Sequence, residues 1–512
     1  MTSTLRPATT EAAPRPGRWL ALSVLVLAVL LVAVDATVLG LATPYISEDL
    51  EPTGTQLLWI GDVYSFVIAG LLVSMGSLGD RIGRKRILLI GATAFGGLSV
   101  LNAYAATPEM LILARALLGV AGATLMPATL ALIRNLFHDP RERSLAIGIW
   151  GAAASAGTAV GPIVGGFLLE HFWWGSVFLI NLPVMAVLVV VGVKLLPESK
   201  NANPGPWDLA SVALSLVGMI AVVYAVKEAA THGFAWATLA IGVLGAAALY
   251  WFVRRQLTLP TPLLDMRLFR NRGFSGAVLA DLLTIFGLAG LVFFLSQYLQ
   301  LVQGRRPFEA GLAELPAAVG AVVAGLVAGR AARRFSVRSV VAGGLAAIGL
   351  ALGALTTLDQ STGYPVLGAA LLVVGVGAGF SFTVTADVIL STVPTEEAGS
   401  ASAVSETAYE LGAALGIAVL GSIVTGVYRG FPSPAGTPES AHESLGGAVE
   451  AAAGLPAGPA EALLTSARQS FVDGLSLAAG AGAVVLLATA VAAWFMLRGQ
   501  RLDGGQGDRP QA

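Results

Sequence analysis

The chain of 512 residues contains no cysteine and little charge. The absence of cysteine excludes disulfide bonds, cysteine metal sites and thiol catalysis. Only 12% of the residues are charged, whereas a soluble domain averages about 25%. A water-soluble fold of this length could not cover its surface with so few charges. The net charge of -1 does not indicate nucleic-acid binding, because the charges are segregated by loop.

Motifs for catalysis and cofactor binding are also missing. The four histidines are scattered outside or at the ends of the apolar segments, without the spacing of a metal site. The sequence contains no P-loop, so the chain itself is not expected to hydrolyse ATP. No catalytic triad or appended soluble domain stands out. We therefore expect neither an enzyme nor a bound cofactor or metal.

Hydrophobic residues are abundant, at 55% of the chain. A helix that crosses a bilayer needs about 20 apolar residues, and fourteen segments have that length. They are 19–41, 57–78, 87–106, 109–134, 144–168, 174–196, 208–227, 236–253, 274–299, 310–330, 338–358, 364–388, 399–427 and 472–497. The sequence therefore predicts an all-α integral membrane protein with fourteen transmembrane helices.

The basic residues favour one orientation of these helices. With a cytoplasmic N-terminus, 24 of the 30 lysines and arginines fall in cytoplasmic segments, as the positive-inside rule requires. An even number of spans puts both termini on that side, and residues 1–18 and 499–512 are predicted to be disordered cytoplasmic tails. The excess of arginine over lysine is typical of a bacterium with a GC-rich genome. We therefore expect a multi-pass protein of a bacterial plasma membrane.

Residues 428–470 form the one long polar insertion outside the membrane. Thr437 and Pro438 have the pattern of a helix N-terminus, and Gly458 and Pro459 repeat it. The intervening Gly-Leu-Pro at 454–456 breaks any helix. We predict two short helices that form an external hairpin; a disordered loop is the alternative.

The sequence contains an internal repeat, in which similar short motifs recur at offsets of 249 to 256 residues. Such repeats are typical of secondary transporters, whose substrate site lies between the repeats near the membrane midplane. Chance matching among 62 glycines is the alternative. The pairing predicts two six-helix halves, 19–200 and 257–498, with two inserted helices in 201–256. The matched positions are Gly76 with Gly325, Gly119 with Gly375, and Gly161 with Gly416.

Across nearly its whole length the sequence resembles the major facilitator superfamily. The segments 76–86, around Arg115, and 157–166 match signatures of that family, the last one being its antiporter signature. The segment from Asp35 to Val38 is similar to a motif of fourteen-span exporters, although Gly40 replaces the usual asparagine. The resemblance implies the major facilitator fold, with fourteen helices arranged as 6+2+6.

Two further segments, 58–65 and 405–412, resemble the drug:proton antiporters of the QacA and LfrA type. That subfamily implies proton-coupled efflux of lipophilic cations, such as quaternary ammonium compounds, dyes and biocides, by alternating access. The partners would be protons, small cationic substrates and lipid. A dedicated exporter of one antibiotic or secreted metabolite is the alternative. One chain contains both halves, so we expect a monomer.

Four acids lie inside apolar spans: Asp35, Asp62, Glu406 and Glu410. Placing an acidic side chain in hydrocarbon costs free energy, so an acid inside a membrane span is by default a candidate for a functional site. Glu406 and Glu410 share a helix face. Ionisation of both carboxylates so close together in a low dielectric would cost much free energy. We predict that these acids bind protons and cations, with Asp281 as a possible additional acid. Two of these acids have a structural alternative: Asp62 could stabilise a helix N-terminus, and Glu406 could be a hydrogen-bonding residue.

Arg115 lies at a depth similar to that of Asp35 and Asp62, about 10 Å below the outer end of its span. A buried arginine needs a partner, and either acid could supply it. Aromatic residues near the acids suit a flat apolar cation, although ordinary packing is the alternative for each. The predicted pocket aromatics are Trp59, Tyr64, Phe66, Phe286 and Tyr409.

Two further groups of residues are predicted to act on conformation. Asp80, Arg81 and Arg84 lie in the predicted cytoplasmic loop and would form a charge latch between the halves. Gly157, Gly161 and Gly165 recur every four residues, so two helix backbones could approach closely there, and Pro162 could kink the helix. Asp387 is interpreted as a cap or loop partner.

Overall fold

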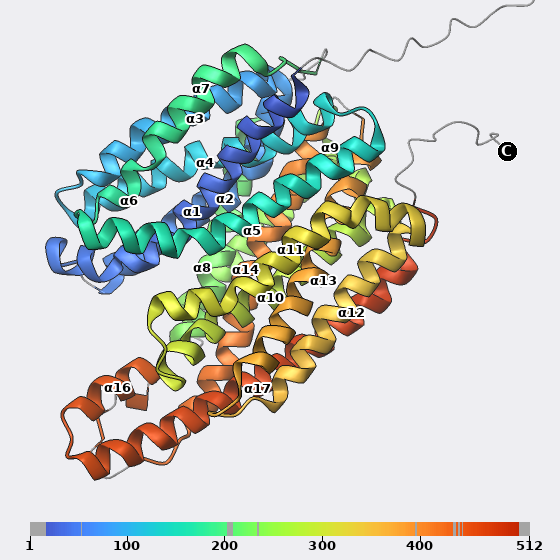
Figure 1. Ribbon diagram of the computed structural model, residues 1–512. Coiled ribbons are helices and arrows are strands. Elements are labelled where there is room, and N and C mark those ends of the chain that lie inside the picture. The colour runs from blue at the N-terminus through green and yellow to red at the C-terminus, as the bar shows by residue number, and fades with distance from the viewer. Residues whose placement is uncertain are drawn as a thin grey trace, which may run out of the picture.

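The computed structural model describes residues 17–52, 54–201, 208–232, 235–394, 397–433, 437–438, 441–442 and 444–500. Every regular element in these residues is a helix. Figure 1 shows a long bundle in which the start of α1 and the end of α17 lie at one end and the α16 segment lies at the other. We call these the terminal end and the hairpin end.

The helices follow the chain in two groups separated by a pair. The first group is α1 (Arg18–Leu50), α2 (Gly54–Ile82), α3 (Arg84–Ala103), α4 (Pro108–Leu136), α5 (Pro140–His171), α6 (Ser176–Leu179) and α7 (Asn181–Leu195). The pair is α8 (Leu209–His232) and α9 (Trp236–Thr258). The second group is η1 (Met266–Arg270), α10 (Arg272–Gln297), η2 (Tyr298–Val302), α11 (Pro307–Phe335), α12 (Val337–Ala354), η3 (Leu355–Thr357), α13 (Tyr364–Thr392), α14 (Ala398–Tyr428), α16 (Leu445–Ala453) and α17 (Ala457–Met496).

Thirteen helical segments of the described residues are long and apolar enough to cross a membrane, and a fourteenth is bent. The bent one is α5, whose parts 140–158 and 163–171 meet at 40°. The predicted kink therefore lies where Pro162 interrupts the ladder of backbone hydrogen bonds. With α5 counted as one span, the structure agrees with the fourteen spans and the all-α membrane fold predicted from the sequence.

The two groups repeat one packing scheme. In the first group α1 packs on α5, α2 on α4, and α3 on α4 and α7. In the second group α10 packs on α14, α11 on α13, and α12 on α13 and α17. The groups meet at two seams, α2 against α14 and α5 against α11. The repeat relates α2 to α11 and α5 to α14, so the two seams are counterparts of each other.

The pair α8 and α9 packs on itself, and α8 also contacts α2 and α14. The inserted helices therefore cover the α2–α14 seam. At the terminal end Asp208 accepts hydrogen bonds from the Arg255 guanidinium at 2.6 and 3.1 Å. Hydrogen bonding to Arg255 lowers the pKa of Asp208 to about 2. This ion pair holds the start of α8 to the end of α9.

The segment between the last two spans differs in part from the two short helices predicted. α16 is a short helix, with the Ser444 hydroxyl accepting from the Gly447 amide at 3.1 Å. The second predicted helix is not separate, because α17 runs without a break from Ala457 to Met496. Proline is tolerated in the first turn of a helix, so Pro459 fits a helix start, and no breaker follows it before the span. Part of the predicted first helix lies outside the described residues.

Candidate functional site

Asp35 lies in a closed polar cluster within the first group. Its Oδ2 is 3.7 Å from Arg115 Nη1, and its Oδ1 accepts a hydrogen bond from Asn181 at 2.7 Å. Asp35 and Arg115 are 4% and 2% exposed. Asp35, one of the two acids predicted as partners of Arg115, thus lies beside it. The cluster joins α1, α4 and the start of α7.

Aromatic rings complete the surroundings of Arg115. The guanidinium lies 4.8 Å from the ring centre of Tyr64 and 6.0 Å from that of Phe178. It also donates to the Ile60 carbonyl at 3.2 Å. A buried guanidinium on aromatic faces gains cation–π attraction. Arg115 is therefore held in place and supplies a fixed positive charge beside Asp35. The side chain of Asp62 lies outside the described residues, as does that of Pro162.

Asp281, on α10 of the second group, is also buried and is 3% exposed. Ser405 donates to its Oδ2 at 2.5 Å, and Thr385 donates to its Oδ1 at 2.9 Å. These hydroxyls come from α14 and α13. No lysine, arginine or histidine of the described residues forms an ion pair with Asp281. Asp35 and Asp281 thus differ: Asp35 has a cation beside it, and the hydrogen-bond partners of Asp281 are hydroxyls.

Glu406 and Glu410 follow Ser405 on α14. Glu406 is 7% exposed and Glu410 is half-buried. The negative charges of Glu410 and Asp281 both act on Glu406. No hydrogen bond or ion pair to the Glu406 side chain occurs among the described residues. Three carboxylates on α10 and α14 are therefore close enough to act on one another electrostatically.

The predicted pocket aromatics occupy two kinds of environment. Tyr64, Phe66 and Phe286 are buried, so a ligand would reach them only after a rearrangement. Trp59 and Tyr409 are more accessible. Trp59 stacks on Tyr224 of the inserted α8 with ring centres 6.0 Å apart, and Tyr409 lies 5.9 Å from Phe382. Sequence reasoning did not include α8 in the site.

The glycine stripe of α5 faces α1. A methyl group on Gly157 would come within 2.6 Å of the Leu30 carbonyl, and one on Gly165 within 3.0 Å of Val38. At Gly161 it would collide with the Thr37 hydroxyl. Small residues let helix backbones approach closely. The predicted close approach thus occurs between α5 and the helix that carries Asp35.

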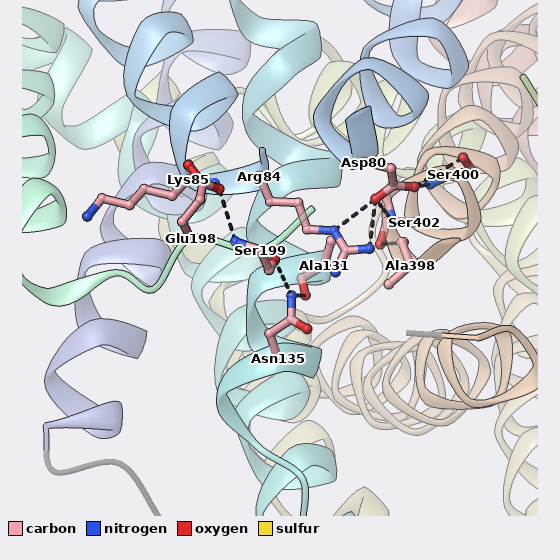
Figure 2. A network of polar contacts seen from close by, with 11 residues as sticks. Asp80, Arg84, Lys85, Ala131, Asn135, Glu198, Ser199, Ala398, Ser400 and Ser402 are labelled. Carbon is pink, nitrogen blue, oxygen red and sulfur yellow. Dashed lines mark hydrogen bonds and ion pairs between the residues drawn. The ribbon is translucent and has the colours of Figure 1, made fainter. Parts of the chain in front are cut away.

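At the first seam Asp80 joins the two groups (Figure 2). Its carboxylate accepts from Arg84 at 2.7 and 2.8 Å and from the backbone amides of Gly399 and Ser400 at 3.1 and 3.0 Å. The two amides belong to the first turn of α14, where a negative charge is stabilised by the helix dipole. Asp80 is therefore bound by a partner from each group.

The position of these residues differs from the loop expected. Asp80 and the partly buried Arg81 lie in the last turn of α2, and Arg84 begins α3. Gly83 alone connects the two helices, with a φ of 116° that a residue with a side chain rarely adopts. The connection is this short because glycine permits the sharp reversal. Asp80 and Arg84 are consequently buried and not in a solvated loop.

A second lock between the groups, beside the second seam, was not expected from the sequence. Asp387 of α13 accepts from Arg143 at 2.7 Å and from the Ser144 hydroxyl, both near the start of α5. Asp387 has no exposed surface, so its interpretation as a cap or loop partner was wrong. One signal was available: Ser144 is the repeat counterpart of Ser400, at an offset of 256. Together the two seams join the groups at the terminal end.

Comparison with known proteins identifies the family. The Major Facilitator Superfamily profile matches residues 25–417. The chain is 49% identical to the multidrug efflux pump LfrA of Mycolicibacterium smegmatis, over 94% of this chain and 97% of that one. It is 38% identical to the methyl viologen resistance protein SmvA of Salmonella typhimurium, over 94% and 98%. It is 34% identical to the puromycin resistance protein pur8 of Streptomyces alboniger, over 94% and 92%.

A solved structure shows the same fold. The human organic anion transporter MFSD10 (TETRAN) superposes with a TM-score of 0.61, covering 94% of this chain and 100% of that one. At 14% sequence identity this likeness concerns the fold alone. The relatives named above are bacterial membrane exporters or resistance proteins, and none of the three is named as an enzyme. The chain therefore belongs to the major facilitator superfamily and is a membrane transporter of small molecules.

Proposed function

We propose that this protein exports lipophilic cations from a bacterial cell in exchange for protons. The single observation that carries the proposal is the pair of buried acids without a basic partner, Asp281 and Glu406. An ionised carboxylate away from water loses several kcal/mol of hydration free energy, and no described cation offsets that loss. Binding either a proton or a positively charged guest removes the cost. Both ligands would compete for the same negative charge.

The surroundings of Asp281 allow it to gain and lose a proton. Thr385 Oγ1 carries one hydrogen, yet it lies 2.9 Å from both Asp281 Oδ1 and the Ser381 carbonyl. When Asp281 is ionised, Thr385 donates to it. When Asp281 is protonated, it donates to Thr385, which then donates to Ser381. Both states satisfy their hydrogen bonds, so a proton can be exchanged without a change of fold.

Asp35 has a different part in the proposed cycle. In the structure its charge is neutralised by Arg115, so it attracts a cation less than Asp281 does. Proton uptake by Asp35 would remove the negative charge beside the buried Arg115, and loss of one charge of a buried ion pair costs about 3–5 kcal/mol. That cost favours a rearrangement of α1 against α4. Asp35 would therefore couple protonation to conformation, whereas Asp281, Glu406 and Glu410 would bind the cation.

The two seams support alternating access. The distribution of basic residues favours a cytoplasmic terminal end, and the Asp80 and Asp387 locks would then close the cytoplasmic side. Release of both locks would open the site inward for a cation from the cytoplasm or inner leaflet. Protons from outside would then neutralise the acids and release the cation on the other side. The termini would both be cytoplasmic, and one chain would suffice.

The direct test uses purified protein in vesicles with an acidic interior. Uptake of ethidium or methyl viologen, itself an organic dication, should depend on the pH gradient and stop when an ionophore collapses it. Asp281→Asn should abolish gradient-driven uptake. The matched control is Glu170→Gln, which removes an exposed acid at the end of α5 and should leave uptake unchanged. Equal uptake with and without the gradient would reject proton coupling.

A dedicated exporter of one compound is the second candidate, and the relative named for puromycin resistance favours it. The same acids would serve either function, because both need a charged site inside the membrane. Transport of chemically unrelated cations by the same vesicles separates the two. Uptake of several such cations supports the multidrug exporter, and uptake of one alone supports the dedicated exporter.

A further inference from the structure

A cavity of about 600 Å³ lies at the second seam, at the terminal end. α5 contributes one wall and α11 the other, so the cavity spans the two groups of helices. Four of the eight side chains that line it are arginines. The lining residues are Arg141, Glu142, Leu145, Leu326, Gly329, Arg330, Arg333 and Arg334.

The charge in this cavity is not balanced by protein. None of its four arginines forms an ion pair with a residue that the structure describes. Its one acid, Glu142, is bound through Oε1 to Arg18 at 2.7 Å. Arg333 Nη1 is buried and has no hydrogen-bond partner. A buried guanidinium nitrogen without a partner carries an unrelieved desolvation cost.

The internal repeat shows what is missing at this place. Gly329 is the counterpart of Asp80, and Arg333 is the counterpart of Arg84, both at an offset of 249. At the first seam the Asp80 carboxylate neutralises Arg84. At the second seam the equivalent position is a glycine, so Arg333 lacks that carboxylate. A methyl group on Gly329 would already collide with Ser144, so the chain cannot supply an acid there without moving α5.

We infer that the cavity binds an anionic phosphate group, the headgroup of an anionic phospholipid, in the place of the missing carboxylate. Arginine binds phosphate oxygens through paired hydrogen bonds, and basic pockets between membrane helices bind such headgroups. A lipid fits better than a free phosphate because Leu145 and Leu326 also line the cavity. The nearby Val327 and Phe335 of α11 are exposed apolar side chains that acyl chains would cover.

The bound headgroup would connect the two groups of helices. Arg141 comes from α5, whereas Arg330 and Arg333 come from α11. Closure of the second seam brings these like charges together, and an anion between them changes repulsion into attraction. Anionic lipid would therefore stabilise the state in which the terminal end is closed.

The test measures lipid retention and does not depend on transport. Purified protein in micelles is titrated with cardiolipin or phosphatidylcholine, and bound lipid is counted by native mass spectrometry. We expect tighter binding of cardiolipin, weakened about five-fold or more by Arg333→Gln, which corresponds to about 1 kcal/mol for each basic side chain. Arg333→Lys should keep most of the preference. The matched control is Arg254→Gln, an exposed arginine of α9 at the same end.

A second variant and a competition experiment separate the lipid site from its alternatives. Arg330→Gln, at an exposed side chain, gives the same readout if Arg333→Gln does not fold. Inorganic phosphate at millimolar concentration should not displace cardiolipin. Displacement would identify a soluble phosphate as the ligand and overturn the lipid assignment. Equal binding of both lipids, or equal loss in Arg254→Gln and Arg333→Gln, would overturn the site.

Discussion

Replacement of Asp80 by asparagine tests the first seam as a latch. The Gly399 and Ser400 amides bind different oxygens of Asp80, so asparagine, with one carbonyl oxygen, would keep an acceptor for only one of them and would lose the charge. Hydrogen bonds to a charged group contribute about 1.5–3 kcal/mol each and neutral ones about 1 kcal/mol. Loss of one such bond and weakening of the other, with the lost interaction with the α14 dipole, amount to about 2–3 kcal/mol at the low end of these ranges. The ratio of open to closed terminal ends should therefore rise by a factor of about 30–150.

The assay uses the absence of native cysteine. Cysteines placed at the exposed Arg86 of α3 and Phe335 of α11 can carry spin labels without background. The distance between the labels should lengthen in Asp80→Asn, while transport slows and cation affinity in detergent changes little. The variant that also carries Arg84→Gln controls for the arginine that loses the Asp80 carboxylate, because it removes that positive charge. An unchanged distance distribution, or a large loss of affinity, would refute the latch.

Further predictions concern the acids, the helix packing and pH. Asp35→Asn should abolish proton-coupled export in vesicles while the protein still inserts, and full activity would reject its assignment. Glu410→Gln should impair transport of some cations and not others, and an unchanged profile across many cations would indicate a structural role. Gly161→Val should lower the melting temperature by the equivalent of about 1–3 kcal/mol of overpacking, whereas Gly166→Ala, with open space around it, should not. The folded pKa of Asp208 is about 2, below the ordinary value, so its ion pair should stabilise the protein above about pH 4 and lose that contribution as the pH falls toward 2. The melting temperature of Asp208→Asn should therefore fall less over this range than that of the parent. An equal fall in both proteins would contradict this prediction.

The sequence predicted those features that depend on local pattern. Apolar length predicted the spans, and the spacing of Gly157, Gly161 and Gly165 predicted one face of close approach. Burial of an arginine predicted an acid beside Arg115, although two acids remained open. These predictions hold because each follows from a short segment and from the cost of placing polar groups in a membrane.

The features missed depend on how distant segments meet. Asp387 and Arg143 are separated by 244 positions, and their contact exists only because α13 docks on α5. Asn181 reaches Asp35 only through the packing of α7 on α1. The extent of α17 was predicted wrongly for a local reason. Pro459 fits the start of a helix, and the sequence after it holds no signal that ends the helix before the last span. The repeat of Ser144 by Ser400 indicates a second contact at the start of α5, but the acid that meets it is Asp387 of α13, since the counterpart of Asp80 is Gly329.

Proton release on cation binding tests the central claim most directly. A quaternary ammonium compound is added to weakly buffered, detergent-solubilised protein, and the pH is followed. The account predicts proton release that saturates with the cation, is smaller in Asp281→Asn and is lost when Asp35, Asp281, Glu406 and Glu410 are all neutralised. Cation binding without any proton release in the unaltered protein, or equal release after all four replacements, would contradict it.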